Sequence, residues 1–119
     1  MYKKELGKWG EELACKYLVN NNYNVIERNY YCRQGEIDII AKDLKRNEII
    51  FIEVKTRTGF MYGFPADAID YSKRVHIKKC AEYYLYKKKL NGINVRFDAI
   101  EIVVNKGVYK LNHIKQISV

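Results

Sequence analysis

Two apolar segments separated by a short polar stretch constrain the fold of this chain more than any other feature of its sequence. Residues 36–42 have the sequence EIDIIAK and residues 48–56 have the sequence EIIFIEVKT, and both patterns are typical of β-strands. The residues LKRN between them indicate a hairpin. The second strand begins with the buried-type run IIFI but ends in Glu53, Lys55 and Arg57. Charged side chains are costly in a protein interior unless they are paired, metal-bound or open to water, so this end of the strand is a candidate site.

The length of the hairpin loop predicts the register of these two strands. If Asp43 faces Glu48 across LKRN, Asp38 lies directly opposite Glu53. Side chains alternate along a strand, so Asp38, Glu53 and Lys55 then point to one face of the sheet. A shift of the register by one residue would separate the two acids.

Two opposed carboxylates have Cβ atoms about 5 Å apart and repel each other, so they favour a cation between them. Oxygen ligands alone favour Mg²⁺ or Mn²⁺ over zinc. The alternative is a surface strand with a solvated Glu53 and Lys55. We favour the metal site, because IIFI precedes Glu53 and GEID contains Asp38 on the facing strand.

The remaining segments predict an α/β fold with a mixed sheet of about five strands and two main helices. The apolar spacing predicts a helix over 3–20 that ends at Asn20-Asn21-Asn22, and a second helix over about 70–90 that ends at Asn91-Gly92. The order is α-β-β-β-α-β-β, with one helix on each face of the sheet or both on one face. The other predicted elements are strands over 23–31, 94–104 and 108–114, a turn over 32–35, and an irregular loop with Gly59, Gly63 and Pro65.

The composition limits the class of protein and its partners. A length of 119 residues predicts one domain, 1–119, with a core of its own. The net charge of +8 attracts polyanions, nucleic acid first and anionic membranes second. No apolar run near the start is long enough for a signal peptide or a membrane span, so we expect a cytoplasmic protein.

The cysteines and histidines give no pattern of a zinc site. The three cysteines are widely spaced without a C-x-x-C pair, so we expect Cys15, Cys32 and Cys80 to be reduced thiols. His76 and His113 are far apart in the sequence, and we expect both to be ordinary surface or boundary residues.

The segments GEIDIIA and IFIEVKTR resemble the D-(x)n-E-x-K core of the PD-(D/E)xK nuclease superfamily, which has the restriction-endonuclease-like fold. Over nearly its full length the chain resembles the YraN-like (UPF0102) family of bacterial proteins, which is similar to archaeal-type Holliday-junction resolvases. Ile37 stands before Asp38, where the superfamily name has proline. The other residues of the match are Gly7, Gly10, Glu11, Asn29, Gly35, Glu36, Gly63, Pro65, Lys73 and Arg96-Phe97-Asp98.

The resemblance implies a Mg²⁺- or Mn²⁺-dependent DNA endonuclease, acting on branched or flapped DNA and leaving 5′-phosphate products. It is also compatible with a homodimer, because resolvase-like nucleases usually cut two strands as pairs. Lys55 would stabilise charge on the phosphate rather than act as a base. The metal would be held by Asp38, Glu53, the carbonyl of Val54 and Glu11, while Arg57 and Lys73 would bind phosphates.

The resemblance implies a glutamate on the first helix near the metal, and a helical wheel favours Glu11 over Glu12. Glu11 lies beside Gly7 and Ala14, whose small side chains allow another element to approach, whereas Glu12 lies in a polar sector. The alternative is that Glu11 is an exposed residue in a capping or ion-pair role.

The second helix contains Lys73 within an apolar arc that also includes Ile69 and Ile77. Lys73 either meets an anion, such as an active-site acid or a DNA phosphate, or extends past the helix end into water. The aromatic residues of this helix alternate with lysines, but at helical spacing we expect the tyrosines to pack in the core rather than to stack on bases. Asp98 would support the site by orienting a neighbouring strand or Arg57.

Two other hypotheses remain beside the nuclease. The chain could be a nucleic-acid-binding module that keeps the fold without catalysis, which would explain the basic charge but leave the acids without a role. It could also be a dimeric scaffold for a protein partner.

Overall fold

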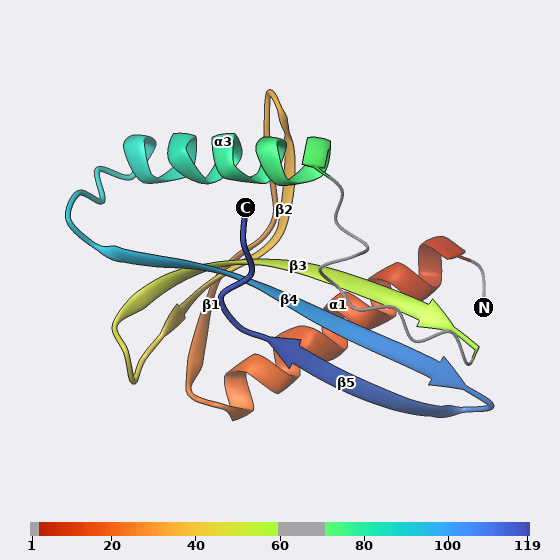
Figure 1. Ribbon diagram of the computed structural model, residues 1–119. Helices are drawn as coiled ribbons and strands as arrows, with labels where there is room; N and C mark the ends of the chain where they lie inside the picture. Colours follow the sequence, from red (N-terminus) through yellow and green to blue (C-terminus); the bar gives the residue numbers. More distant parts are fainter. Residues whose placement is uncertain (1–2, 60–70) are drawn as a thin grey trace.

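The computed structural model describes residues 3–59 and 71–119, without the side chain of Tyr71. Gly63, Pro65 and Ile69, which were assigned to the irregular loop and the apolar arc, lie outside the described residues. The predicted order α-β-β-β-α-β-β is confirmed (Figure 1). The elements are α1 (Lys3–Asn20), β1 (Tyr23–Cys32), β2 (Gly35–Asp43), β3 (Glu48–Thr58), α3 (Tyr71–Lys87), β4 (Asn94–Asn105) and β5 (Val108–Ile114).

The five strands form one mixed sheet in the order β1-β2-β3-β4-β5. The pairs β1/β2, β2/β3 and β4/β5 are antiparallel, whereas β3 and β4 are parallel. A parallel pair needs a crossover connection, and α3 lies within the segment that joins β3 to β4.

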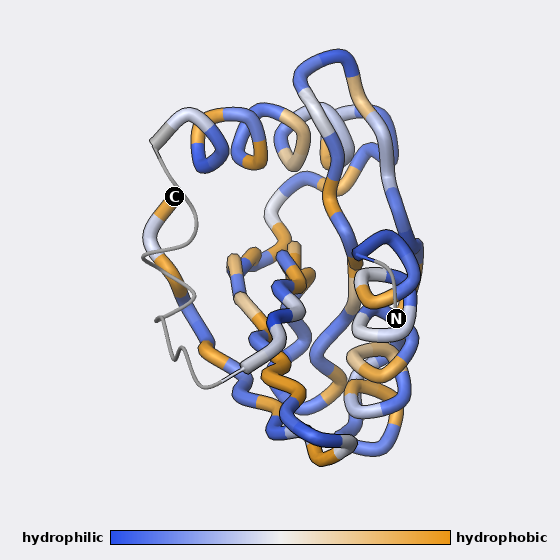
Figure 2. The backbone as a smooth tube through the Cα atoms, turned by 90° about the vertical axis from the view of Figure 1, so that its right-hand side faces the viewer, coloured by the Kyte–Doolittle hydropathy of each residue, from blue (hydrophilic) through white to orange (hydrophobic). Residues whose placement is uncertain are grey.

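One helix covers each face of the sheet, which decides between the two arrangements that the sequence left open (Figures 1 and 2). Alternation along β3 sends Ile50 and Ile52 to the face covered by α1, while Ile49 and Phe51 face α3. Ala14 and Leu18 of α1 complete the first cluster, and Cys80, Ala81 and Tyr84 of α3 complete the second. Within the described part of the chain, no helix has both the length and the apolar character needed to cross a membrane.

A glycine allows α1 to approach β3 closely, but it is not the one that the sequence suggested. A Cβ atom at Gly10 would collide with the side chain of Thr56 on β3, whereas nothing lies within 4 Å of one at Gly7. The close approach therefore depends on Gly10, which precedes Glu11 and fixes how near Glu11 comes to the sheet.

The prediction of three reduced thiols is wrong for one pair. Cys32 at the end of β1 and Cys80 of α3 form a disulfide, with Cα atoms 5.7 Å apart, and Cys15 is free and buried. The pairing was not visible in the sequence, because the two residues are 48 positions apart and meet only when α3 packs on the β1–β2 hairpin.

Candidate active site

The predicted register of β2 and β3 is confirmed. Asp43 faces Glu48, and the pairing continues to Ile39 opposite Ile52. Described pairing between the two strands stops there, one residue before Asp38 and Glu53. The ladder between β1 and β2 has a gap at the same point, because Asn29 has a φ of 51° and interrupts β1 where it would face Asp38.

Asp38 and Glu53, called here the acid pair, meet where β2 separates from β3. Asp38 Oδ2 accepts a hydrogen bond of 2.8 Å from the backbone N–H of Val54, and the two carboxyl groups are hydrogen-bonded to each other. Their exposed fractions are only 5% and 4%. The bond from Val54 fixes the Asp38 carboxyl beside β3, which brings the two acids together.

Lys73 of α3 provides a positive charge at the acid pair. Its Nζ lies 2.9 Å from Glu53 Oε1. Burial disfavours the charged lysine, but the hydrogen bond to Glu53 and the charges of Glu53 and Asp38 outweigh it and raise the pKa of Lys73. Of the two alternatives for Lys73, the structure therefore supports contact with an anion, the carboxylate of Glu53.

Apart from Lys73, the surroundings of the acid pair disfavour ionised carboxylates. Burial, followed by the charge and hydrogen bond of Glu53, raises the pKa of Asp38 from 3.8 to about 7. Burial, followed by the charges of Asp38 and Glu36, also raises the pKa of Glu11. A buried site that concentrates carboxylates beyond its nearby positive charge is suited to binding a cation.

The positions of Glu11 and Glu12 agree with the choice made from the helical wheel. The Glu11 carboxylate interacts with Asp38 and Glu36 and accepts a hydrogen bond from the Asn29 side chain. Glu12 instead forms a surface ion pair of 3.0 Å with Arg28, and its side chain is 56% exposed. Glu11 is thus the helix-borne acid that contributes to the field at Asp38.

Beyond Glu53, the end of β3 faces an acid that the sequence analysis missed. Lys55 lies opposite Glu101 of β4, and Arg57 Nε lies 3.7 Å from Glu101 Oε2. Glu101 is only 5% exposed, and this oxygen has no hydrogen-bond partner. Burial raises the pKa of Glu101, while Arg57 lowers it. The available signal was a lone acid within the apolar run AIEIVV, the pattern that also marks Glu53.

Comparison with known proteins identifies the family of the chain. Residues 10–102 match the model of the uncharacterised protein family UPF0102. The protein belongs to the UPF0102 family. A UPF0102 protein of Clostridium botulinum (strain 657) is 48% identical over 103 residues, covering 86% of this chain and 82% of the relative. A UPF0102 protein of Clostridium tetani is 47% identical over 104 residues, covering 87% and 84%. One of Caldicellulosiruptor saccharolyticus is 43% identical over 105 residues, covering 88% and 87%.

Asp98 of this UPF0102 chain belongs to a separate buried cluster on the α1 face of the sheet. Its carboxylate accepts hydrogen bonds of 2.9 and 3.0 Å from Arg96 and one of 3.0 Å from the Gln116 backbone. It also lies 2.7 Å from Nε2 of His113 on β5. Asp98 therefore ties β4 to its neighbouring strand, as one alternative proposed, and the other is wrong because Arg57 pairs with Glu101.

The expected boundary position of His113 agrees with its partial burial, but the residue also links three elements of the fold. Its side chain is 4% exposed, and its Nδ1 lies 2.8 Å from the hydroxyl of Tyr17 on α1. His113 thus links α1, β4 and β5 through hydrogen bonds, a role that depends on contacts between segments far apart in the sequence.

The donor set of the acid pair determines which metal it suits. Among residues 3–59 and 71–119, no group of three or more His, Cys, Asp or Glu side chains is arranged to hold a metal ion. The site therefore offers two carboxylates with Glu11 nearby. Mg²⁺ is commonly bound by one or two carboxylates and completed by water and substrate phosphate oxygens, so the residues fit Mg²⁺ or Mn²⁺ and do not fit structural zinc.

Proposed function

We propose that this UPF0102 protein is a metal-dependent DNA endonuclease of the restriction-endonuclease-like superfamily. The observation that carries the proposal is the acid pair, in which a buried Asp38 with a pKa of about 7 touches Glu53. The resemblance of GEIDIIA and IFIEVKTR to the D-(x)n-E-x-K core supports the assignment to DNA phosphodiester hydrolysis. Branched or flapped DNA is the substrate class that this resemblance implies.

Each residue of the site has a distinct task in this proposal. Asp38, Glu53, the Val54 carbonyl and Glu11 would hold Mg²⁺ or Mn²⁺. When bound, the ion lowers the pKa of a water molecule and neutralises charge on the phosphodiester. The Val54 N–H holds the Asp38 carboxyl in place, so Asp38 needs little reorganisation. Lys55, on the same face of β3 as Glu53, would donate hydrogen bonds to the phosphate oxygens as their negative charge increases.

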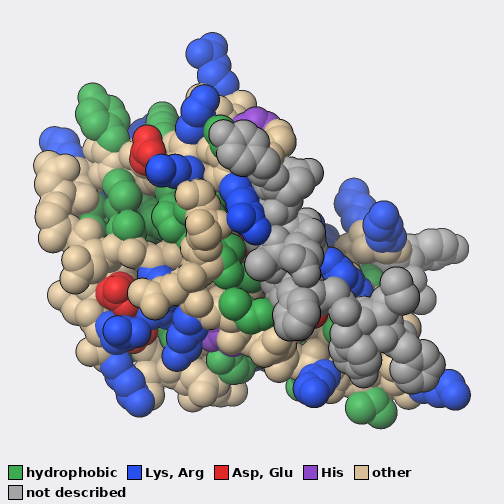
Figure 3. All heavy atoms as spheres, in the orientation of Figure 1, with side chains coloured by type: hydrophobic (Ala, Val, Ile, Leu, Met, Phe, Trp, Pro, Cys, Tyr) green, Lys and Arg blue, Asp and Glu red, His purple; other side chains and the backbone are tan. Residues whose placement is uncertain are grey.

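The charge of the molecule supports a polyanionic substrate. The net charge is +8, and Figure 3 shows lysine and arginine side chains spread over one face with few acidic ones between them. Lys73 contacts Glu53 and Arg57 lies four residues beyond Glu53 on β3, and both would contact DNA phosphates. Such contacts bind the backbone independently of base sequence.

A panel of labelled linear, flap, three-way and four-way DNAs, incubated with Mn²⁺, tests the proposal. The native protein is expected to cut at least one of them. Asp38→Asn and Lys55→Ala should each lower the rate by about a hundredfold or more, because each removes transition-state stabilisation. Lys45→Ala in the β2–β3 loop removes the same charge at the end of the hairpin opposite to the acid pair and should cut like the native protein. Equal cutting by native protein and Lys55→Ala would reveal a contaminating nuclease and overturn the proposal.

A second candidate function is a nucleic-acid-binding module without catalysis. It is favoured by the Lys73–Glu53 ion pair, which supplies a positive charge where the metal would bind. Calorimetric titration of Mn²⁺ into native protein and Asp38→Asn separates the two functions. A nuclease requires binding by the native protein that the substitution weakens, whereas DNA binding without any metal binding would support the module.

A further inference from the structure

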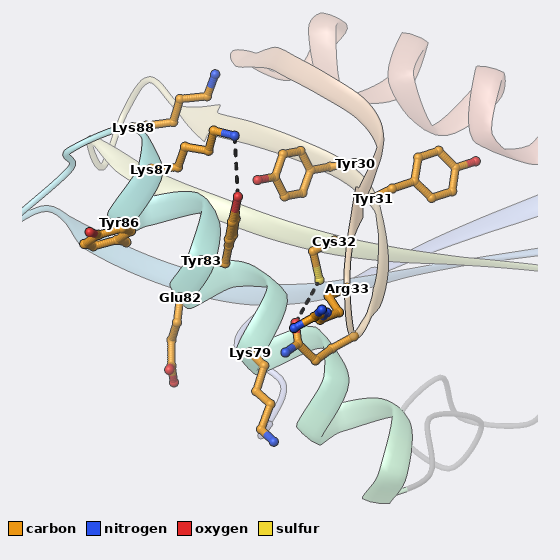
Figure 4. A pocket seen from close by; sticks show the side chains of 11 residues that line it. Tyr30, Tyr31, Cys32, Arg33, Lys79, Glu82, Tyr83, Tyr86, Lys87 and Lys88 are labelled. Carbon is orange, nitrogen blue, oxygen red and sulfur yellow. Dashed lines mark hydrogen bonds between the residues drawn. The ribbon is translucent and has the colours of Figure 1, made fainter.

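A groove lies between the β1–β2 hairpin and the C-terminal half of α3, and neither acid of the acid pair lines it. Its volume is about 890 Å³, and we call it the hairpin–helix groove (Figure 4). Lys79, Tyr83, Tyr86 and Lys87 line it from α3, and Tyr30 and Arg33 line it from the hairpin. The α3 residues recur every three or four positions, so they occupy one face of the helix.

The tyrosines of this face contradict the expectation that the aromatic residues of α3 are core residues. Tyr84 shares the buried face with Ile77, Cys80 and Ala81 and is 3% exposed, so the expectation is correct for it. Tyr83 and Tyr86 fall on the opposite side and are 41% and 84% exposed. Two accessible aromatic rings on adjacent turns of one helix do not serve the core, so they are available for a ligand.

Contacts between β1 and α3 fix the shape of the groove. Tyr30 extends from β1 toward Tyr83, and its ring packs edge-on against buried Tyr84 with centroids 5.1 Å apart (Figure 4). The disulfide between Cys32 and Cys80 joins the hairpin to α3 at the same place. A surface that is already fixed loses less conformational entropy when it binds a ligand.

The charge of the groove specifies what kind of ligand it fits. Four basic side chains line it, those of Arg33, Lys79, Lys87 and Lys88, against one acid, Glu82. The Lys87 ammonium lies over the Tyr83 ring, 5.6 Å from its centroid, so cations and aromatic faces are interleaved. Basic side chains beside accessible aromatic rings are the surface that binds unpaired nucleic acid, since the rings stack on bases and the cations contact phosphates. A duplex has its base faces covered and offers only its phosphates.

The groove and the acid pair lie along the same helix and the same hairpin. Lys73, near the start of α3, contacts Glu53, and Tyr86 lies 13 residues later, which corresponds to roughly 20 Å along the helix axis. On the hairpin, Tyr31 points away from Tyr30, and its hydroxyl hydrogen-bonds to Glu36 close to Asp38 and Glu11 (Figure 4). A strand seated in the groove would therefore run along α3 toward the acid pair.

We infer that the hairpin–helix groove binds an unpaired DNA strand, with bases stacked on Tyr86 and Tyr83 and phosphates on Lys79 and Arg33. The inference deepens the proposed function, on which it rests for the cut at the acid pair, and it defines the substrate as DNA with an unpaired strand beyond that cut. Binding in the groove itself requires no metal.

Fluorescence anisotropy with a labelled oligothymidylate, measured with the full chain in EDTA, tests this binding. The native protein is expected to bind the single strand more tightly than a duplex of equal length. Tyr86→Ala should weaken binding about five- to a hundredfold through the lost stacking, while Tyr86→Trp keeps it. Tyr109→Ala removes an exposed tyrosine of β5 outside the groove and should leave the affinity unchanged. Tighter duplex binding, or native affinity of Tyr86→Ala, would overturn the inference.

A second arm tests the phosphate contacts. Lys79→Gln should lower the slope of log affinity against log salt concentration by about 0.7, the value for one contact to a single strand. Lys110→Gln removes the same charge from β5 and should keep the native slope. Identical slopes for the two variants would mean that the net charge, not the groove, attracts the DNA.

The two proposals fail in different ways. If Tyr86 governs binding but no DNA is cut with Mn²⁺, the nuclease proposal fails and the groove remains a single-strand site. If DNA is cut but Tyr86→Ala binds the oligothymidylate like the native protein, the groove proposal fails alone.

Discussion

The β2–β3 hairpin contains two facing pairs of acids, and they differ in how their charge is balanced. Asp43 and Glu48 face each other beside the loop, while Asp38 and Glu53 meet beyond the other end of the pairing. Arg96 Nη1 binds both acids of the first pair, at 3.1 and 3.0 Å. At the second pair, Lys73 is bound to Glu53.

The carboxyl groups differ in pKa although Asp43 and Asp38 have the same exposed fraction, 5%: burial is the largest cause of the shift at Asp38, whereas hydrogen bonds outweigh burial at Asp43. Burial alone would raise the pKa of Asp43, but hydrogen bonds from the Arg46 backbone and from Arg96 lower it overall. The pKa of Asp38 is raised to about 7 instead. At the loop end, Arg96 neutralises the acids and stabilises the fold. At the acid pair, the negative charge is not fully neutralised, which favours binding of an external cation.

Removal of the cation from each pair should give the largest contrast. Arg96→Ala removes a buried positive charge that Asp43, Glu48 and Asp98 share, and we expect it to lower the free energy of unfolding by about 3–5 kcal/mol. Lys73→Ala removes a side chain that is 38% exposed, and we expect a loss of about 1 kcal/mol. Urea unfolding at pH 7 measures both values. Equal losses would mean that the two acid pairs are balanced alike.

Substitution of the two aspartates should give effects of opposite sign that depend on pH. The pKa of Asp38 is higher in the folded state than the unfolded value of 3.8, so the folded protein holds this proton more tightly. Its contribution to stability is present below about pH 4 and is lost as the pH rises through about 7. Asp38→Asn removes this loss, and in EDTA at pH 8 we expect it to stabilise the protein by roughly 2–4 kcal/mol.

Asp43→Asn is the matched control for Asp38→Asn. The folded-state pKa of Asp43 is lowered, so its stabilisation is present above the unfolded pKa and is lost as the pH falls. Asp43→Asn should therefore destabilise the protein at pH 8 and matter less near pH 3. Urea unfolding across pH 3–8 compares the variants, and parallel curves for native protein and Asp38→Asn would contradict the raised pKa.

The acid pair could be predicted from the sequence because it depends on local rules. Strand alternation and the four-residue loop LKRN were enough to place Asp38 beside Glu53, and the structure has the predicted register from Asp43–Glu48 to Ile39–Ile52. The element order follows in the same way from apolar spacing and the stops at Asn22 and Gly92. These signals are all contained within one hairpin or one helix.

The Arg96 cluster could not be predicted, because its partners come together only through the sheet. Arg96 and Asp43 are 53 positions apart, and their contact depends on β4 pairing in parallel with β3. The exposed tyrosines of α3 were missed for a related reason. The sequence shows that the helix has two faces, but it does not show which tyrosines face the sheet. Packing around Cys80 and Tyr84 determines that orientation.

The smallest changes in the free energy of unfolding are expected for Glu11 and Glu12. These acids are adjacent on α1, but Glu11 lies near Asp38 and Glu12 lies at the surface. Glu11→Gln removes a negative charge from the surroundings of Asp38, and we expect it to stabilise the protein only slightly at pH 8 in EDTA, because solvent screens this partly exposed side chain. Glu12→Gln removes the surface ion pair with Arg28 and should cost up to about 0.5 kcal/mol. Calorimetry with Mn²⁺ sharpens the contrast, because only Glu11→Gln should weaken the metal several-fold. If both variants bound Mn²⁺ like the native protein, the charge at the metal would come from the hairpin alone, and α1 would contribute packing through Gly10 but no ligand.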